Sequence, residues 1–270
     1  MNKMEKKEDI NFKVDPNIIK QRERKKNINF KIDPNIIRHF EPSILYSLQK
    51  EPGVNEFIFN LFKNASDFAF SEKIKNINDE LKDSQFYNAF PGSHYRMLNG
   101  IVKYLNPKLV VEIGTYTGMG TFALSQNLSG EIISFDVVDY KNFETHLSDQ
   151  FLKKNKFKQY LSDLSEKTEY DKHYELLNNA DIIFIDAPKD GKFEYKLLAN
   201  MTNLKNKENK ILILDDIKLM NMINLWNSIE SPKMDAVSVG NWTGTGLVDI
   251  SKGLILSNKT QPITNNQNQE

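Results

Sequence analysis

Between residues 109 and 229, short apolar runs alternate with stretches whose apolar residues recur at helical spacing. The runs predict strands and the stretches predict helices. The predicted strands are Leu109–Ile113, Glu131–Asp136, Phe157–Leu161, Asp181–Asp186 and Ile211–Asp215. The predicted helices lie near Thr121–Leu128, Phe143–Lys154, Tyr170–Asn178, Phe193–Met201 and Leu219–Ile229. Strands that alternate with helices form parallel sheets, so we expect an α/β fold with a doubly wound, mostly parallel sheet.

The pattern changes near the C-terminus. Met234–Gly240 and Lys252–Ser257 look like strands, and no helical stretch separates them. We therefore expect an antiparallel hairpin at one edge, which brings the sheet to seven strands. Residues 258–270 are polar and are expected to form a disordered tail.

The N-terminal third is predicted to be helical in part. Residues 41–88 place several Leu and Phe residues at roughly helical spacing, which indicates N-terminal helices that cap the main domain over residues 41–90. A further helix is expected from Gly92-Ser93 to Leu105, with Ser93 as its N-cap. The main domain is thus expected to span residues 41–257.

Residues 1–40 contain a tandem repeat. DINFKVDPNIIK at Asp9–Lys20 returns as NINFKIDPNIIR at Asn27–Arg38, 18 residues later. Two copies are too few to bury a core of their own. The segment is either a recent duplication in a flexible arm or a docking motif that packs on the domain or on a second subunit, which leaves a homodimer open.

Composition narrows the class of protein. Hydrophobic residues make up 39% and charged residues 27% of the chain, which is typical of a globular protein. The net charge is zero, so we expect neither nucleic acid nor a membrane as a partner. The absence of cysteine excludes disulfides and thiolate zinc sites. The polar N-terminus and the lack of an apolar run of about 18 residues favour a cytoplasmic location.

The segment Leu109–Thr121, LVVEIGTYTGMGT, runs from a strand through two glycines into a helix. Glycine lets the backbone turn sharply beside a ligand, and ligands of such sheets bind at the carboxyl ends of strands. The spacing E-x-G-x-x-x-G differs from the dinucleotide pattern G-x-G-x-x-G. Glu112 before the glycines suits a cofactor that carries an ammonium group. The alternative is a tight turn without a ligand.

Two further strand ends carry acids. Asp136 closes the next strand, 24 residues after Glu112, where a carboxylate can accept hydrogen bonds from ribose hydroxyls. This position does not separate S-adenosylmethionine from NAD. Ser162 and Asp163 follow the third strand and are candidates for the adenine edge, although Asp163 is equally suited to cap a helix.

Three acids are expected to converge at one edge of the sheet. Asp186 ends one apolar strand, and Asp215 with Asp216 ends another. Carboxylates that lie close together repel one another, and a divalent cation removes this repulsion. Oxygen ligands favour Mg²⁺, or Ca²⁺ and Mn²⁺. The alternative is that these acids cap helices or face solvent.

The series VVEIGTYTGMGT, then ISFD, then Ser162-Asp163, resembles the motifs of class I S-adenosylmethionine-dependent methyltransferases. The likeness covers roughly residues 90–257 and is closest to the metal-dependent, catechol-type O-methyltransferases. It implies S-adenosylmethionine as cofactor and Mg²⁺ as metal. The cofactor site it implies consists of Glu112, Gly114, Thr115, Tyr116, Gly118, Asp136, Ser162 and Asp163.

The same resemblance implies catalytic residues. Asp186-Ala187-Pro188-Lys189 matches the catechol-type pattern Asp-x-x-Lys, whose lysine is the general base. The resemblance thus implies Lys189 and Asp186 as catalytic residues, while a surface role for Lys189 is the alternative. Asp215-Asp216 departs from the catechol-type Asp-Asn and resembles the macrocin-type sugar O-methyltransferases. Their base would fall at Pro188, so the base and the acceptor stay open.

The acceptor is expected to be a small hydroxylated molecule, phenolic or sugar. Trp242 in the loop Asn241–Gly246 is a candidate to stack on it, and His94 is a second candidate for the pocket. Either residue can instead be a packing residue. The competing functions are a nucleotide-binding oxidoreductase, which the missing G-x-G-x-x-G disfavours, and a catalytically silent binding protein with the same fold.

Overall fold

The computed structural model describes residues 52–88, 93–219 and 221–257. The tandem repeat, Gly92 at the expected start of a helix and the C-terminal tail lie outside these described residues. None of the helices in this described part has the length and apolarity that a membrane span requires.

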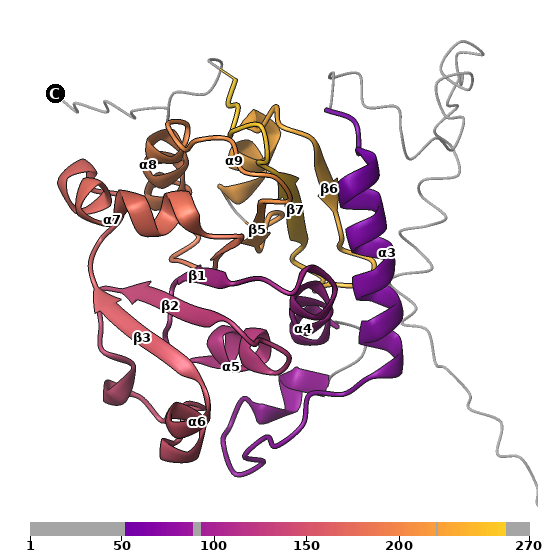
Figure 1. Ribbon diagram of the computed structural model, residues 1–270, viewed down its shortest axis with the longest axis vertical. Helices are drawn as coiled ribbons and strands as arrows, with labels where there is room; N and C mark the ends of the chain where they lie inside the picture. The colour runs from indigo at the N-terminus through magenta and orange to yellow at the C-terminus, as the bar shows by residue number, and fades with distance from the viewer. Residues whose placement is uncertain (1–51, 89–92, 220, 258–270) are drawn as a thin grey trace, which may run out of the picture. The chain divides into compact units, whose positions relative to one another are not determined.

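The centre of the domain is a seven-stranded sheet (Figure 1). Its order is β3-β2-β1-β4-β5-β7-β6, with β1 to β5 parallel and β7 antiparallel to both neighbours. The prediction of a mostly parallel, doubly wound sheet with an antiparallel edge is confirmed. The strands are β1 Leu109–Ile113, β2 Glu131–Asp136, β3 Lys156–Leu161, β4 Ile182–Ile185, β5 Ile211–Asp215, β6 Lys233–Asp235 and β7 Thr245–Asp249.

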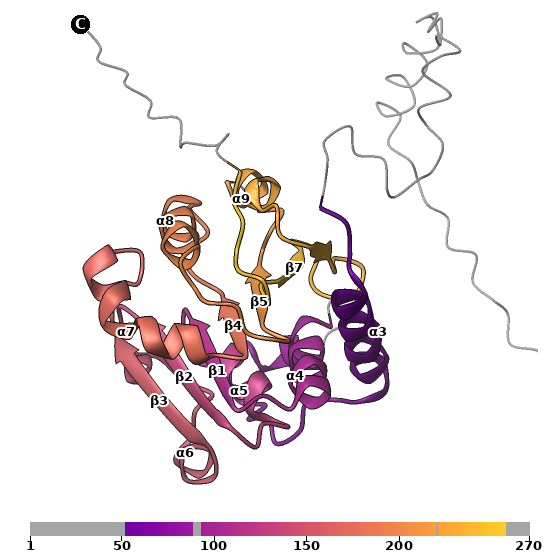
Figure 2. The same cartoon turned by 45° about the horizontal axis from the view of Figure 1, so that its top comes forward.

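Helices cover both faces of the sheet (Figure 2). They are α3 Glu56–Ser71, α4 His94–Leu105, α5 Met119–Ser125, α6 Asp149–Lys154, α7 Lys167–Asn179, α8 Lys192–Met201 and α9 Met222–Ser228, with 3₁₀ turns η1 Ser84–Asn88 and η2 Tyr140–Asn142. Successive residues of a strand point to opposite faces. Val110 therefore packs in the cluster with α3 and α4, whereas Val111 packs in the cluster with α7, α8 and α9.

The strand order reverses between β1 and β4. From β1 the chain adds β2 and β3 on one side, and it then returns to add β4 and β5 on the other side of β1. In open parallel sheets, ligands bind outside the carboxyl ends of the strands at this switch point. The residues that follow β1, β2, β4 and β5 therefore meet along one edge, and the candidate site is built there.

The second strand of the antiparallel hairpin was predicted at the wrong place. The strand is β7 at Thr245–Asp249, while the expected strand Lys252–Ser257 contributes one isolated bridge from Leu256 to Ile229. Thr245 and Gly246 were taken for loop residues because glycine and threonine are typical of turns. Gly246 is required in the strand because an added Cβ would lie 2.5 Å from a ring atom of Trp226.

The first strand of the hairpin and the helix predicted at Phe143–Lys154 are also shorter than expected, and part of the N-terminal segment is not helical. β6 covers Lys233–Asp235, because the chain turns after it with Gly240 donating to the carbonyl of Ala236. The helix expected at Phe143–Lys154 begins at Asp149, where the Ser148 side chain accepts from the amide of Phe151. In the described part of the N-terminal segment, residues 72–83 lie between α3 and η1 and are not helical.

Ser93 precedes α4 as expected, but its side chain accepts no hydrogen bond from a backbone amide of the first turn. Its hydroxyl instead accepts from the guanidinium of Arg96 at 2.7 Å. Ser93 therefore marks the start of α4 without capping it through its side chain.

Candidate active site

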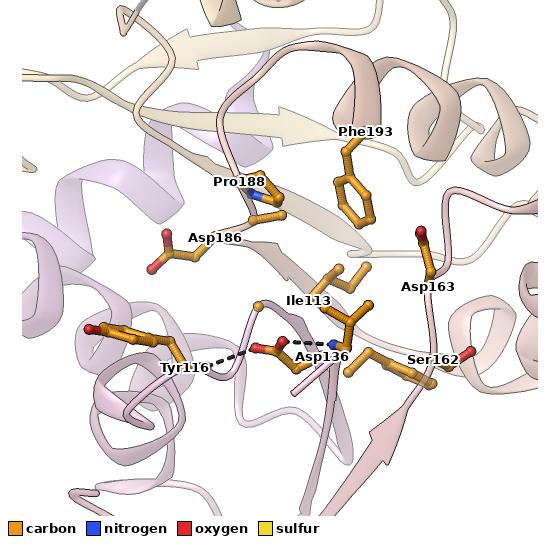
Figure 3. Close-up of a pocket in the computed structure, with 12 residues that line it drawn as sticks. Ile113, Tyr116, Asp136, Ser162, Asp163, Asp186, Pro188 and Phe193 are labelled. Carbon is orange, nitrogen blue, oxygen red and sulfur yellow. Dashed lines mark hydrogen bonds between the residues drawn. The ribbon is translucent and has the colours of Figure 1, made fainter. Parts of the chain in front are cut away.

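A cavity of about 460 Å³ opens at the carboxyl ends of β1, β2 and β4 (Figure 3). Six residues of the expected site line it: Gly114, Tyr116, Asp136, Ser162, Asp163 and Asp186. The remaining lining is mostly apolar and was not predicted: Ile113, Phe135, Val137, Ala187, Pro188 and Phe193. The Phe193 ring points into the cavity from the start of α8 (Figure 3). A cavity of this size with few polar groups is typical of a small-ligand site.

The turn after β1 depends on glycine. Gly114 has φ +100°, and an added Cβ would lie 2.0 Å from the carbonyl oxygen of Asp186. The loop and the end of β4 are also joined by the Asp186 amide, which donates to the carbonyl of Ile113 at 2.8 Å. Only glycine lets the backbone pass this close, so the loop and the first acid are held together by main-chain contact. Gly118, with φ +85°, starts α5 and lies outside the cavity lining.

The Asp136 carboxylate holds the loop in place. One oxygen accepts from the amides of Thr115 at 2.8 Å and Tyr116 at 2.9 Å, and Figure 3 shows the bond from Tyr116. The other accepts from the amides of Val137 at 2.7 Å and Val138 at 3.1 Å. A carboxylate has about four acceptor positions, so these bonds use its full capacity. Any ribose hydroxyl that binds Asp136 has to share or replace one of them.

Glu112 lies beneath the loop rather than in the cavity. It is 1% exposed and accepts from the hydroxyls of Thr121 and Ser134, while its Oε1 atom has no hydrogen-bond partner among the described residues. Burial raises the pKa of Glu112 to about 8, so at neutral pH the side chain is mostly uncharged. A direct charge contact between Glu112 and the ammonium group of a cofactor does not match this position.

Thr115 shares the polar network beneath the loop. Its hydroxyl lies 2.7 Å from that of Ser134 and accepts from the Gln159 side chain at 2.9 Å. It does not line the cavity. Of the loop residues expected to bind the cofactor, Gly114 and Tyr116 therefore line the cavity, whereas Thr115 supports the loop from below.

Ser162 and Asp163 line the far side of the cavity. The Ser162 hydroxyl donates to Glu169 at 3.0 Å, and one Asp163 oxygen accepts from the amide of Ser165 at 2.9 Å. Asp163 thus stabilises a turn before α7, whereas the N-cap position of that helix is Glu166, so the alternative role of Asp163 as a helix cap is not confirmed. Its position in the cavity lining still fits the adenine-edge role.

The three acids expected to hold a metal do converge. Carboxylate oxygens of Asp186, Asp215 and Asp216 lie within 4.8 Å of one another. The ammonium of Lys189 lies among them, in contact with Asp186, 3.1 Å from Asp216 Oδ2 and 3.7 Å from Asp215 Oδ2. We call these four residues the acid–lysine cluster. Asp186 also lines the cavity, so the cluster and the cavity are continuous.

The surroundings of the acid–lysine cluster shift the pKa values of Asp215 and Lys189. Burial raises the pKa of Asp215 to about 6, with His94 and Lys189 opposing and the two other acids adding to the rise. Burial lowers the pKa of Lys189, but the three carboxylates outweigh this and hold it above its ordinary value. As the structure stands, Lys189 is a cation that neutralises part of the acid charge.

Two residues of the cluster have left-handed backbone. Lys189 has φ +65° and Asp216 has φ +56°, a conformation that costs non-glycine residues free energy and often marks functional sites. Glu194, which is fully buried, accepts from the amides of Lys189 at 2.7 Å and Gly191 at 3.0 Å. Glu194 was not predicted from the sequence, although its position three residues after Gly191 is that of the acidic residue of a capping box; because glycine has no side chain, only the bond from the Gly191 amide to Glu194 forms.

The two candidates for acceptor binding differ in exposure. The Trp242 side chain is 85% exposed, in the loop that precedes β7. His94 is 4% exposed, with Nδ1 2.9 Å from the hydroxyl of Thr245 and 3.7 Å from Asp215. His94 is therefore a packed residue beneath the acid–lysine cluster, the second of its two expected roles.

Two neighbours of Trp242 contact the acids. Asn241 donates from its amide to Asp215 at 2.7 Å, and the hydroxyl of Thr243 donates to Asp216. Neither was predicted, because the loop joins strands whose limits were misplaced.

Comparison with known proteins identifies a matching family and several solved structures with a similar fold. A family model described as O-methyltransferase matches residues 75–226, which is more than half of the chain. No curated protein matches the chain.

Three solved structures illustrate the structural likeness. An S-adenosylhomocysteine-bound methyltransferase from Podospora anserina, PaMTH1, has 14% identity over 74% of this chain and 89% of its own, with TM-score 0.40. A methyltransferase from Geobacter sulfurreducens has 17% identity over 84% and 98%, with TM-score 0.41. The MycE methyltransferase of mycinamycin biosynthesis, in complex with Mg and S-adenosylhomocysteine, has 13% identity over 50% and 35%, with TM-score 0.40. All three are distant likenesses.

Proposed function

The chain belongs to the O-methyltransferase family, and from that membership we propose that it methylates a hydroxyl of a small acceptor with a divalent cation bound at the acid–lysine cluster. The sequence-based prediction of a class I, S-adenosylmethionine-dependent methyltransferase is confirmed at the level of the family.

The position, size and lining of the cavity support its proposed role as the binding site for S-adenosylmethionine. It lies at the switch point of the sheet, and its volume of about 460 Å³ suits a nucleoside with a short side chain. Ser162 and Asp163 offer polar atoms at one side, and Phe193 offers an aromatic face for a base. Gly114 lets the backbone approach the amino-acid end.

The observation that carries the cation proposal is the place of the Lys189 ammonium. A positive charge already lies among three carboxylates, which is the position that a divalent cation would take. The oxygen donors fit Mg²⁺, so Asp186, Asp215 and Asp216 would hold it. Asn241 and His94 each face Asp215 through one side-chain nitrogen. Their other polar atoms, Asn241 Oδ1 and His94 Nε2, are buried without a partner among the described residues, and such atoms are often satisfied by ordered water.

The proposed chemistry is in-line transfer of a methyl group from the sulfonium to the acceptor oxygen, with positioning as the main contribution of the protein. A bound divalent cation supplies Lewis acidity that makes the acceptor hydroxyl easier to deprotonate. Lys189 is the candidate base. The three acids keep Lys189 protonated as the structure stands, so the role of base requires their charge to be neutralised first.

Trp242 is proposed to contact the acceptor. Its indole is exposed, and both of its neighbours bond acids of the cluster, so a ring or sugar face stacked on it would lie close to the cation position. A phenolic or sugar hydroxyl fits this arrangement.

Transfer of labelled methyl from S-adenosylmethionine to a panel of phenols and sugars tests the proposal. Mg²⁺ is expected to stimulate turnover and EDTA to remove it. Asp215→Ala is expected to lower metal-stimulated turnover by at least about 100-fold, since Lewis-acid stabilisation is worth several kcal/mol, while cofactor binding is retained. Asp171→Ala, on the exposed face of α7, is the matched control. Activity that survives both EDTA and Asp215→Ala would show that the cation mechanism is wrong.

A further inference from the structure

In both Asp215 and Asp216, the two carboxylate oxygens have different partners. In Asp215, Oδ1 accepts from the Asn241 amide at 2.7 Å, while Oδ2 lies 3.7 Å from the Lys189 ammonium. In Asp216, Oδ1 accepts from the Thr243 hydroxyl, while Oδ2 lies 3.1 Å from the same ammonium. Each acid therefore has one oxygen fixed by a donor from the loop and the other turned toward the position of the positive charge.

The segment that carries these donors, residues 241–243, is fixed to the chain that follows the acids. The Lys218 amide donates to the carbonyl of Thr243 at 2.8 Å, and the Ile217 amide donates to Gly244 at 3.1 Å. Gly244 closes the turn by donating to Asn241 at 3.0 Å. Because the donors are held by main-chain bonds, they keep their direction when the carboxylates move.

The backbone at the end of β5 explains why Asp215 and Asp216 need the donors from Asn241 and Thr243 to hold their carboxylates. Consecutive residues of a strand point to opposite sides, yet Asp215 and Asp216 both reach the Lys189 ammonium. The left-handed φ of +56° at Asp216 turns its side chain back to the same point. Without a bond to the outer oxygen, either carboxylate could rotate and lose the orientation of the inner one.

We propose that Asn241 and Thr243 are positioning residues of the cation site, which set its affinity by holding Asp215 and Asp216 in the binding orientation. This inference rests on the proposed function, since it concerns the same site. An amide and a hydroxyl orient the acids without adding charge, so the full negative charge of the cluster stays available to the cation. Outer partners of metal ligands act in this way, and their loss costs about 10- to 100-fold in metal affinity.

Titration of the full chain with Mn²⁺, with free Mn²⁺ followed by electron paramagnetic resonance, tests the inference without any acceptor. Thr243→Val and Asn241→Ala are each expected to raise the Kd for Mn²⁺ by about 10- to 100-fold. Thr243→Ser keeps the hydroxyl and is expected to restore the affinity. Thr202→Val and Asn64→Ala, which remove exposed donors to helix carbonyls elsewhere, are the matched controls and are expected to change nothing.

Binding of S-adenosylmethionine, measured on each variant, shows that the protein is folded. If folded Thr243→Val and Asn241→Ala bind Mn²⁺ like the unaltered chain, the positioning role is overturned and the cation site remains. If the unaltered chain binds no Mn²⁺, the cation site and this inference fall together. Should Thr243→Val not fold, Asn241→Ala alone decides between these outcomes.

Discussion

At Lys189, a single ammonium lies where three carboxylates meet, and its backbone adopts a left-handed conformation to bring it there. A monovalent side-chain cation and a divalent ion would use the same oxygens. Lys189 therefore has two effects. It lowers the repulsion among the three acids when no ion is present, and it competes with a divalent ion for their oxygens.

Lys189→Met removes this competitor while keeping a side chain of similar length. The variant is expected to bind Mn²⁺ at least about tenfold more tightly, because an ion pair worth 1.4 kcal/mol or more no longer has to be broken. Methyl transfer is expected to fall by about 100-fold or more, the usual contribution of a general base. Lys196→Met, which removes an exposed lysine from α8, is the control. Equal or weaker Mn²⁺ binding by Lys189→Met would contradict the account of this residue.

Glu112 leads to a prediction about pH. Its folded-state pKa of about 8 lies above the ordinary value of 4.5, so between these values the folded state binds more protons than the unfolded state. Stability is therefore expected to fall as pH rises through this window, by up to about 1.4 kcal/mol per pH unit from this group.

Denaturant unfolding of the unaltered chain and of Glu112→Gln, repeated between pH 5 and pH 8, measures this contribution. The glutamine keeps the shape of the uncharged acid, so the variant is expected to lose less stability as pH rises. Parallel stability curves for the two proteins would show that Glu112 does not titrate in this range.

Residues of the site were predictable to different degrees. The meeting of Asp186, Asp215 and Asp216 follows from sequence, because the ends of parallel strands share an edge. The hydrogen-bond partners of a side chain, in contrast, do not follow from its position in a strand. Asp136 was placed correctly, but the sequence does not reveal that four amides occupy its oxygens.

Among the elements, the turn from β1 into α5 places the most severe steric limits on the site. Gly114→Ala would place a Cβ 2.0 Å from the backbone oxygen of Asp186, at a φ of +100°. Because the atom it meets belongs to the backbone, either the loop or the end of β4 would have to move. We expect this variant to lose cofactor binding and to melt at a lower temperature. Gly53→Ala has no atom within 4 Å of the added methyl and is expected to be neutral. Calorimetric binding of S-adenosylmethionine by Gly114→Ala with unchanged affinity would contradict this account of the turn.

The elements also show where the sequence pattern is informative. β1, β4 and β5 are buried on both faces and form continuous apolar runs, which are readily recognised. β7 is TGLVD, and its glycine is explained only by the Trp226 ring that packs against it from α9. That contact joins residues 20 positions apart in the chain, so it is not visible to a local pattern.

For the molecule as a whole, the main consequence of the fold is that two binding regions share Asp186. The residue lines the cavity and belongs to the acid–lysine cluster, and in Figure 3 its carboxylate points away from Ser162 and Asp163. A methyl group at the near end of the cofactor would then lie beside an acceptor oxygen held at the cluster.

Two ligands that bind the folded state are expected to stabilise it separately. S-adenosylmethionine at about 100 times its Kd adds about 2.7 kcal/mol, a rise in melting temperature on the order of 5 to 10 °C for a domain of this size. Mg²⁺ is expected to add a further rise that EDTA reverses. Differential scanning fluorimetry on the unaltered chain and on Asp215→Ala measures both, and an Mg²⁺ effect that persists in the variant would place the ion elsewhere.

The cavity beside Gly114 and Asp136 is proposed to bind S-adenosylmethionine. Titration calorimetry of the unaltered chain with S-adenosylmethionine, and in parallel with NAD, tests it most directly. The account predicts one site for S-adenosylmethionine with micromolar affinity and no heat of binding with NAD. Binding of NAD with no heat from S-adenosylmethionine would contradict it.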